Sequence, residues 1–318
     1  MGVSDCIMHG PSEGVSEETD EANSAVKIVG GNVFVELDPD HPGFKDEGYR
    51  SRRNEIAKIA LEWNEMSMDE RRSKKIPHAP YSEDEDAVWA AIMERITPVH
   101  EKYACKQYLE NAKNLGLPND RIPQLQEVSE RLEEMTGFRQ EPVGGLVHPK
   151  TFHTALANRV FLSTQYIRHS SRPFYTPEPD VVHELVGHTA MLGVPEWAEL
   201  NVLFGEADMR TESEAAITRL GSVYWYVLEF GACREGGNVK AVGPGLLSSF
   251  GEMEHACASG EVEYRKPNFE EMETLPYDVT QYQPVLFVWD SFEEMYEKTK
   301  EFISNWGTEN DPRIELHK

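Results

Sequence analysis

The feature that most constrains the fold is the spacing of apolar residues in three long stretches of the first half of the chain. In residues 47–66, 83–116 and 122–137, apolar side chains recur at intervals of three and four, which is the spacing of one face of an α-helix. Pro98 lies inside the second stretch, so we expect an interruption of the helix near it. The third stretch has a proline at its start and Gly137 at its end, as helices commonly do. These patterns predict a mainly helical protein.

The second half of the chain mixes helices with short strands. Residues 212–233 are apolar on nearly all sides towards their end, which indicates a buried helix. No internal repeat and no phosphate-binding glycine loop is found. The remaining predicted elements are a glycine-containing loop over 141–152, a short helix over 153–161, an extended segment over 164–180, a helix carrying 181–188, a closing helix over 291–306, and strands over 32–37, 238–243 and 283–289.

The domain organisation follows from composition. Residues 1–24 are acidic, contain glycine and serine, and have almost no large apolar side chains, so we predict a disordered acidic tail over residues 1–30. No linker divides the rest. We therefore predict a single domain over residues 31–318, of the α+β class: mainly α with small β-sheets.

Charge and cysteine content exclude several classes of partner. The chain has 31 Lys and Arg against 56 Asp and Glu, a net charge of −25, which disfavours nucleic acid and anionic membranes as partners. No apolar run approaches the roughly 18–20 residues that span a bilayer. The four cysteines are far apart, form no C-x-x-C pair and follow no cleavable signal. These features predict a soluble cytoplasmic protein with free thiols.

The segment "VVHELVGH" resembles a zinc-peptidase motif with one residue too many. The peptidase pattern places two histidines four residues apart, whereas His183 and His188 are five apart and Gly187 occupies the expected position. Five residues of an α-helix turn by about 500°, so the two side chains would point roughly 140° apart. Both histidines can bind one metal only if the helix ends or distorts near Gly187–His188. Two histidines that merely pack on a helix are the simplest alternative.

A buried carboxylate supports the metal interpretation. Glu229 lies among Trp225, Leu228 and Phe230, where a carboxylate is costly to bury unless it is paired or binds a cation, and no cationic residue lies one helical turn away. Two histidines and one carboxylate form the ligand set of non-haem Fe(II) oxygenases. Glu184 competes for this role, because it lies on the same face as the second histidine, and the sequence alone does not choose between the two. A zinc hydrolase with Glu184 as the general base is the alternative enzyme.

Several long motifs resemble the catalytic domain of the pterin-dependent aromatic amino acid hydroxylases. They are "STQYIRHSSRPFYTPEPDVVHELVGH", "YWYVLEFG" and "GPGLLSSFGE", together with residues 38–53 and 121–138, so the similarity extends from about residue 32 to the end. Within this family, "YW" before the glutamate and "SSFGE" are most similar to phenylalanine hydroxylases. The resemblance implies the single-domain hydroxylase catalytic fold for residues 31–318.

The resemblance also implies a role for each matching residue. It makes His183, His188 and Glu229 the iron ligands, and Glu184 a catalytic group near the pterin. Gly145, Val147 and Phe152 match residues that hold the pterin, the last by stacking. The implied contacts to the amino acid are Arg168, which pairs with its carboxylate, and Thr176, Pro179, Trp225, Phe230 and Ser248, of which the serine also orients an iron-binding histidine.

The implied activity is hydroxylation of the ring of a free aromatic amino acid with Fe(II), a tetrahydropterin and O2, most like phenylalanine to tyrosine; tryptophan and tyrosine are the alternative substrates. Two departures concern the pterin: this chain has "GLVHPKTF" where animal members read like "GLLSSRDF", and Leu162 replaces a histidine. Biopterin, another pterin or a folate all remain possible cofactors. Because no heptad-bearing helix ends the chain, we expect a monomer or a weak dimer.

Overall fold

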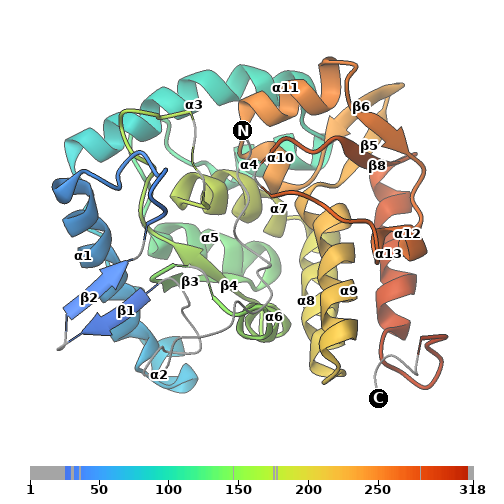
Figure 1. The fold of residues 1–318 in the computed structure, drawn as a ribbon, viewed down its shortest axis with the longest axis horizontal. Coiled ribbons are helices and arrows are strands. Elements are labelled where there is room, and N and C mark those ends of the chain that lie inside the picture. The colour runs from blue at the N-terminus through green and yellow to red at the C-terminus, as the bar shows by residue number, and fades with distance from the viewer. Residues whose placement is uncertain are drawn as a thin grey trace.

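Helices surround small sheets in this protein (Figure 1), which confirms the predicted fold class. One contiguous cluster of buried apolar side chains extends from Trp63 to Trp306, as in a single domain. The computed structural model describes residues 26–29, 32–35, 37–145, 147–174, 176, 178–279 and 281–313.

Three of the predicted helices form as expected. They are α1 (Glu47–Asn64), α5 (Leu125–Thr136) and α13 (Phe292–Asn305). The first begins where the Asp46 side chain accepts a hydrogen bond from the Tyr49 N–H. The second ends at Gly137, whose φ of 76° is the left-handed conformation that glycine adopts without strain.

The predicted interruption near Pro98 is wrong. Helix α3 (Glu83–Tyr103) continues through this proline, which removes only one helical hydrogen bond. The chain leaves the helix at Ala104, which is extended and pairs with Ala241, and α4 (Lys106–Leu115) follows. The break is placed by pairing with a segment far away in the sequence, which helical periodicity does not encode.

The region from 139 to 164 is a strand–helix–strand unit, which corrects two predictions. Strand β3 (Arg139–Val143) takes the beginning of the predicted loop, α6 (Pro149–Ala157) starts earlier than the predicted helix, and β4 (Val160–Thr164) takes its end. The two strands are parallel, with Arg139 opposite Val160. The pair packs against α1, α5 and α6, so it is buried on both faces and lacks the alternating pattern by which strands are recognised.

The second half of the chain adds a helical layer and a sheet, on the right in Figure 1. Helix α8 (Pro195–Met209), which the sequence did not predict, packs against α6, α9 (Glu214–Tyr224) and α13. The predicted strands 238–243 and 283–289 are confirmed as β6 (Asn238–Ala241) and β8 (Val285–Trp289). They join β5 (Ala232–Glu235) and β7 (Glu263–Arg265) in the order β6-β5-β8-β7. The short helices are α2 (Met68–Arg72), α7 (Ala190–Leu192), α10 (Pro244–Leu247), α11 (Phe250–Ala258) and α12 (Phe269–Met272).

At the beginning of the described chain, β1 (Val26–Val29) pairs antiparallel with β2 (Asn32–Val35). The second strand confirms the prediction for 32–37. The first lies inside the predicted disordered tail, so the boundary at residue 30 is wrong; residues 1–25 lie outside the described part of the chain.

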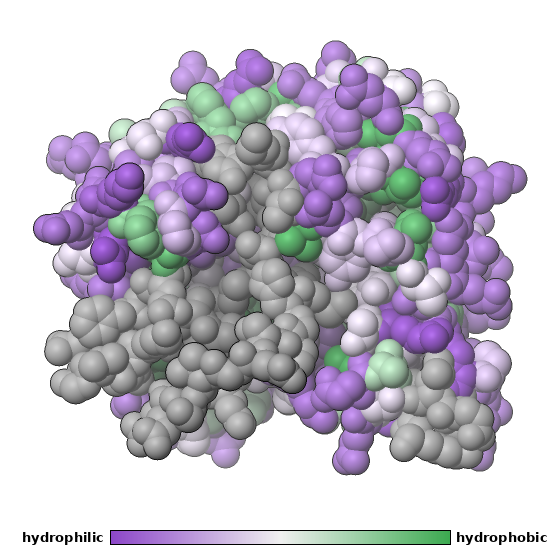
Figure 2. Space-filling view, viewed as in Figure 1, coloured by the Kyte–Doolittle hydropathy of each residue, from purple (hydrophilic) through white to green (hydrophobic). Residues whose placement is uncertain are grey.

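The surface is predominantly hydrophilic on the face that Figure 2 shows, with small scattered hydrophobic spots. Among the described residues, the large apolar side chains that are exposed are Met68, Phe174, Met209 and Tyr264. No helix of the described chain has the length and apolarity needed to cross a bilayer.

Candidate metal centre

Two π-helical turns carry the candidate metal ligands. The turn η1 (His183–Thr189) interrupts the helix that begins at Val181, and η2 (Trp225–Glu229) closes the helix that α9 begins. The predicted distortion at Gly187–His188 is therefore confirmed: the helix widens there and continues into α7. A π turn has hydrogen bonds five residues apart, so a spacing of five comes close to one full turn. The predicted helix over 212–233 ends at Glu229, and its last residues enter β5.

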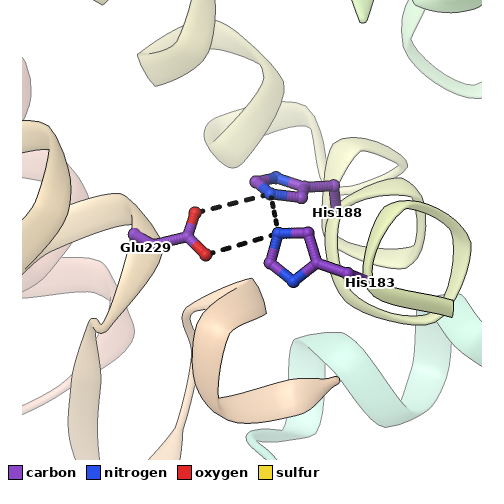
Figure 3. Close-up of side chains that lie close together, drawn as sticks. All are labelled: His183, His188 and Glu229. Carbon is purple, nitrogen blue, oxygen red and sulfur yellow. Dashed lines mark hydrogen bonds and ion pairs between the residues drawn. The ribbon is translucent and has the colours of Figure 1, made fainter. Parts of the chain in front are cut away.

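The three candidate ligands converge from these two turns (Figure 3). One ligand atom from each of His183, His188 and Glu229 lies within 4.8 Å of the other two. The two Nε2 atoms are 3.0 Å apart, and they lie 3.5 and 3.4 Å from the two carboxylate oxygens. All three side chains are buried, with 1%, 4% and 3% of their surfaces exposed. The structure therefore selects Glu229, and not Glu184, as the carboxylate of the cluster.

Ser248 fixes the tautomer of His183. Its hydroxyl donates to the Pro244 carbonyl at 2.8 Å, so its oxygen can only accept from Nδ1–H of the imidazole, 2.9 Å away. The proton is on Nδ1, and Nε2 directs a lone pair towards Glu229. This contact agrees with the orienting role that the resemblance implied for Ser248.

The charges of the cluster call for a cation. Burial lowers the pKa of His183 to about 4 and that of His188 well below its ordinary value, which favours neutral imidazole rings. Burial raises the pKa of Glu229 to about 8. One of its oxygens, Oε2, has no hydrogen-bond partner among the described residues. Imidazole lone pairs and a carboxylate repel one another unless a cation or a proton lies between them, so these residues fit a divalent metal.

Glu184 is anchored to β4 through one of its carboxylate oxygens, and its charge adds to the effect of burial in raising the pKa of Glu229. Its Oε1 accepts from the backbone N–H of Thr164 at 3.2 Å and from its hydroxyl at 3.0 Å. Burial raises the pKa of Glu184 to about 8. A general base for a zinc hydrolase needs a free oxygen near the metal. Thr164 occupies Oε1, and among the described residues the carboxylate that converges with the two histidines is that of Glu229 and not that of Glu184, so Glu184→Gln is the variant that tests this alternative.

Comparison with known proteins identifies the family. A family model described as "Biopterin-dependent aromatic amino acid hydroxylase" matches residues 16–311. The chain belongs to this family. Bovine (Bos taurus) phenylalanine-4-hydroxylase is 40% identical over 276 residues, 85% of this chain and 59% of that protein. Tyrosine 3-monooxygenase of Schistosoma mansoni is 39% identical over 282 residues, 87% of this chain and 58% of that protein. The chain thus spans somewhat more than half the length of these relatives.

Solved structures of a bacterial phenylalanine hydroxylase share the fold. One form from Chromobacterium violaceum has a TM-score of 0.68 at 28% identity, and covers 74% of this chain and 83% of that one. Another form, with bound iron(III) and oxidised 7,8-dihydrobiopterin, has a TM-score of 0.67 at 28% identity and covers 70% and 82%. Family members therefore bind iron and a pterin, and a candidate iron site is present in this hydroxylase-family chain.

Arg168, predicted to pair with a substrate carboxylate, already has a carboxylate partner. Its Nε and Nη2 donate to the two oxygens of Asp180 at 2.8 and 2.7 Å, and both side chains are buried. Asp180 also accepts from the backbone N–H of His183 at 3.3 Å. The Nη1–Nη2 edge of the guanidinium is the one that a second carboxylate can use. Asp180 was not among the predicted site residues, although its place just before the helix is typical of a helix cap.

The predicted amino acid contacts lie in two groups of buried residues. Thr176 is buried and its hydroxyl donates to the Glu178 carbonyl at 2.6 Å, and Pro179 is buried beside it. Trp225 stacks on Tyr277 with ring centroids 4.3 Å apart, and its ring centroid is 4.5 Å from that of Phe230.

The predicted pterin contacts are only partly brought together. Val147 and Leu162 line a cavity of about 430 Å³ between α2, α6 and the β3–β4 pair. Phe152 is not among the residues that line it: it is 9% exposed and packs edge-on against Phe161 and Tyr224. Gly145 is buried just after β3. Leu146, between Gly145 and Val147, lies outside the described residues.

Proposed function

We propose that this chain is an iron(II)- and tetrahydropterin-dependent monooxygenase that converts phenylalanine to tyrosine. The observation that carries the proposal is the buried cluster of His183, His188 and Glu229, with neutral imidazoles and an unpartnered carboxylate oxygen, in a chain of the hydroxylase family. These three residues would hold the iron, and a metal with only three protein ligands would have positions left for O2 and water.

The chain's own residues hold the iron and orient the substrate. When bound, the iron and the pterin supply the electrons that activate O2 for transfer of one oxygen atom to the ring. Asp180 holds Arg168 so that its free edge receives the substrate carboxylate. Burial of the site excludes water, so that oxygen transfer is directed to the substrate.

The choice of phenylalanine rests on "YW" before Glu229 and on "SSFGE", which are most similar to phenylalanine hydroxylases, and is supported by the contacts of Trp225 and its neighbour Tyr226. The Trp225 indole N–H donates to Gln283, and the Tyr226 hydroxyl lies 3.3 Å from the carbonyls of Leu275 and Pro276. These polar groups are occupied within the protein and do not wait for a ring hydroxyl. The indole of Trp225 therefore has no free donor for a ring hydroxyl, which suits an unsubstituted ring. Hydroxylation of tryptophan or tyrosine is the alternative within the family.

We assign the pterin to the space bordered by Gly145, Val147, Phe152 and Glu184, on the strength of the resemblance. The cavity at Val147 supports this side of the assignment. Because Phe152 is packed edge-on, a side-chain rotation or a shift of α6 would accompany stacking. Replacing Phe152 by Ala should raise the KM for tetrahydrobiopterin with little effect on the iron content.

The test is hydroxylation of each amino acid by the iron-loaded protein with tetrahydrobiopterin in air. We expect tyrosine from phenylalanine, and less product from tryptophan or tyrosine. Glu229→Gln should abolish both iron binding and product, whereas Glu184→Gln should keep the iron. No product from any of the three amino acids with iron bound would refute the proposal; hydrolysis that needs zinc and Glu184 would establish the alternative.

Two further predictions concern the protein in solution and in the cell. Light scattering tests the expected monomer or weak dimer, and a tetramer would contradict it. Cell fractionation tests the cytoplasmic location, with which the free thiols of Cys105, Cys233 and Cys257 agree.

A further inference from the structure

A chain of buried polar side chains connects the β3–β4 pair to the turn η1. The Ser163 hydroxyl donates to the Gln140 amide oxygen. The amide nitrogen of Gln140 donates to the Thr189 hydroxyl at 2.9 Å, and this hydroxyl donates to the Glu184 carbonyl at 2.8 Å. All three side chains have 0% of their surfaces exposed. Buried polar groups of this kind define one arrangement when each is satisfied, and are costly when one partner is lost.

The donor and acceptor in each of these hydrogen bonds follow from the last acceptor, the Glu184 carbonyl. The Glu184 carbonyl can only accept, so the Thr189 hydroxyl must donate to it and accept from Gln140. The Gln140 amide must then present its oxygen to Ser163. Its backbone N–H is held in turn by the Ser129 hydroxyl of α5, at 2.8 Å. This series of hydrogen bonds thus connects η1 to β3, β4 and α5.

The last link joins the two ends of the widened turn. Glu184 and Thr189 are five residues apart and enclose His188, while His183 precedes them directly. In a regular α-helix the two histidines would point roughly 140° apart, so a metal site requires the wider turn. A side-chain hydroxyl that reaches back five residues favours the π turn over the α-helical alternative.

We propose that Ser163, Gln140 and Thr189 are positioning residues for the iron site, which hold η1 in its π form so that the two histidines converge. Among the described residues, none of these three side chains forms a hydrogen bond with the ligand atoms of His183, His188 or Glu229. The inference rests on the proposed iron site. The geometry of that site then depends on hydrogen-bonded side chains that begin in the β3–β4 pair.

The test uses Thr189→Val, which removes the hydroxyl and keeps the shape, with Thr97→Val as the matched control. The Thr97 hydroxyl also donates to a helical carbonyl, that of Met93 at 2.7 Å, but in the α-helix α3. The dissociation constant for Fe²⁺ and the visible absorption spectrum of the Co²⁺-loaded protein are measured for each. We expect Thr189→Val to weaken Fe²⁺ binding by about 10- to 100-fold, the usual effect of losing a support of metal ligands, and to change the Co²⁺ spectrum.

Thr189→Ser restores a hydroxyl and should rescue both readouts, and Thr97→Val should leave both unchanged. Should Thr189→Val fail to fold, Gln140→Met replaces it. This variant removes the amide that joins Ser163 to Thr189, and it should likewise weaken Fe²⁺ binding and change the Co²⁺ spectrum. A wild-type dissociation constant and spectrum in the folded variant would overturn the inference while leaving the proposed function intact. Failure of the wild-type protein to bind Fe²⁺ would instead refute the proposed iron site.

Discussion

The stability of this protein should depend on pH through Glu252, a carboxyl group outside the candidate site. Its side chain is 1% exposed and accepts a hydrogen bond from the backbone N–H of Gln283 at 2.9 Å. Burial raises the pKa of Glu252 to about 7, from an ordinary value of 4.5. The folded protein therefore binds this proton more tightly than the unfolded chain. The stabilisation is complete below the unfolded pKa and is lost as the pH rises through the folded pKa.

The size of the effect follows from the two pKa values. At about 1.4 kcal/mol for each pH unit between them, ionised Glu252 lowers the free energy of unfolding by about 3 kcal/mol at pH 8. Glu252→Gln cannot ionise and keeps an oxygen to accept from Gln283. The variant should therefore be more stable than the wild type by up to about 3 kcal/mol at pH 8, with the gain shrinking towards zero near pH 5.

Urea unfolding at pH 5, 6, 7 and 8 measures this difference, because pH effects from all other groups cancel between variant and wild type. The matched control is Glu254→Gln, two residues along the same helix and exposed, which should show no such trend. A stability difference that is the same at pH 5 and pH 8 would refute the reasoning.

Three further substitutions test buried contacts. Ser248→Ala leaves the first histidine ligand without its acceptor and should weaken Fe²⁺ binding by about 10- to 100-fold; unchanged affinity in a metal titration would contradict it. Asp208→Ala removes the buried carboxyl that lies 3.2 Å from His153 Nδ1 and should lower the free energy of unfolding by about 1–3 kcal/mol, measured with urea, because the buried imidazole loses its polar neighbour; leucine at both positions should lower it less. Glu178→Ala removes the ion-pair partner of buried Arg53. Because Glu178 lies between Thr176 and Pro179, two predicted amino acid contacts, the loss should raise the KM for the amino acid without loss of iron; an unchanged KM would contradict this expectation.

The sequence was sufficient to predict a metal-binding site and its candidate ligands. Residue type and the cost of burying a charge made His183, His188 and Glu229 candidate ligands, with Glu184 as a competing carboxylate, and the family resemblance then favoured Glu229. Long amphipathic helices such as α1 and α13 were also predictable, because their periodicity is a property of the local chain. The same spacing argument required a distortion near Gly187, and the π turn is that distortion.

Tertiary structure decided what local patterns cannot encode. Strands β3 and β4 are covered on both faces, so they show no alternation, and α8 is buried on most sides, so it shows no clear polar face. The choice of Glu229 over Glu184 also came from the fold, since among the described residues it is Glu229 that brings a carboxylate oxygen within 4.8 Å of both histidine nitrogens. Residue types indicate which side chains can bind a metal, whereas the meeting of those side chains at one point depends on contacts between segments distant in the sequence. The polar chain that begins in the sheet and ends at Thr189 is a contact of that kind.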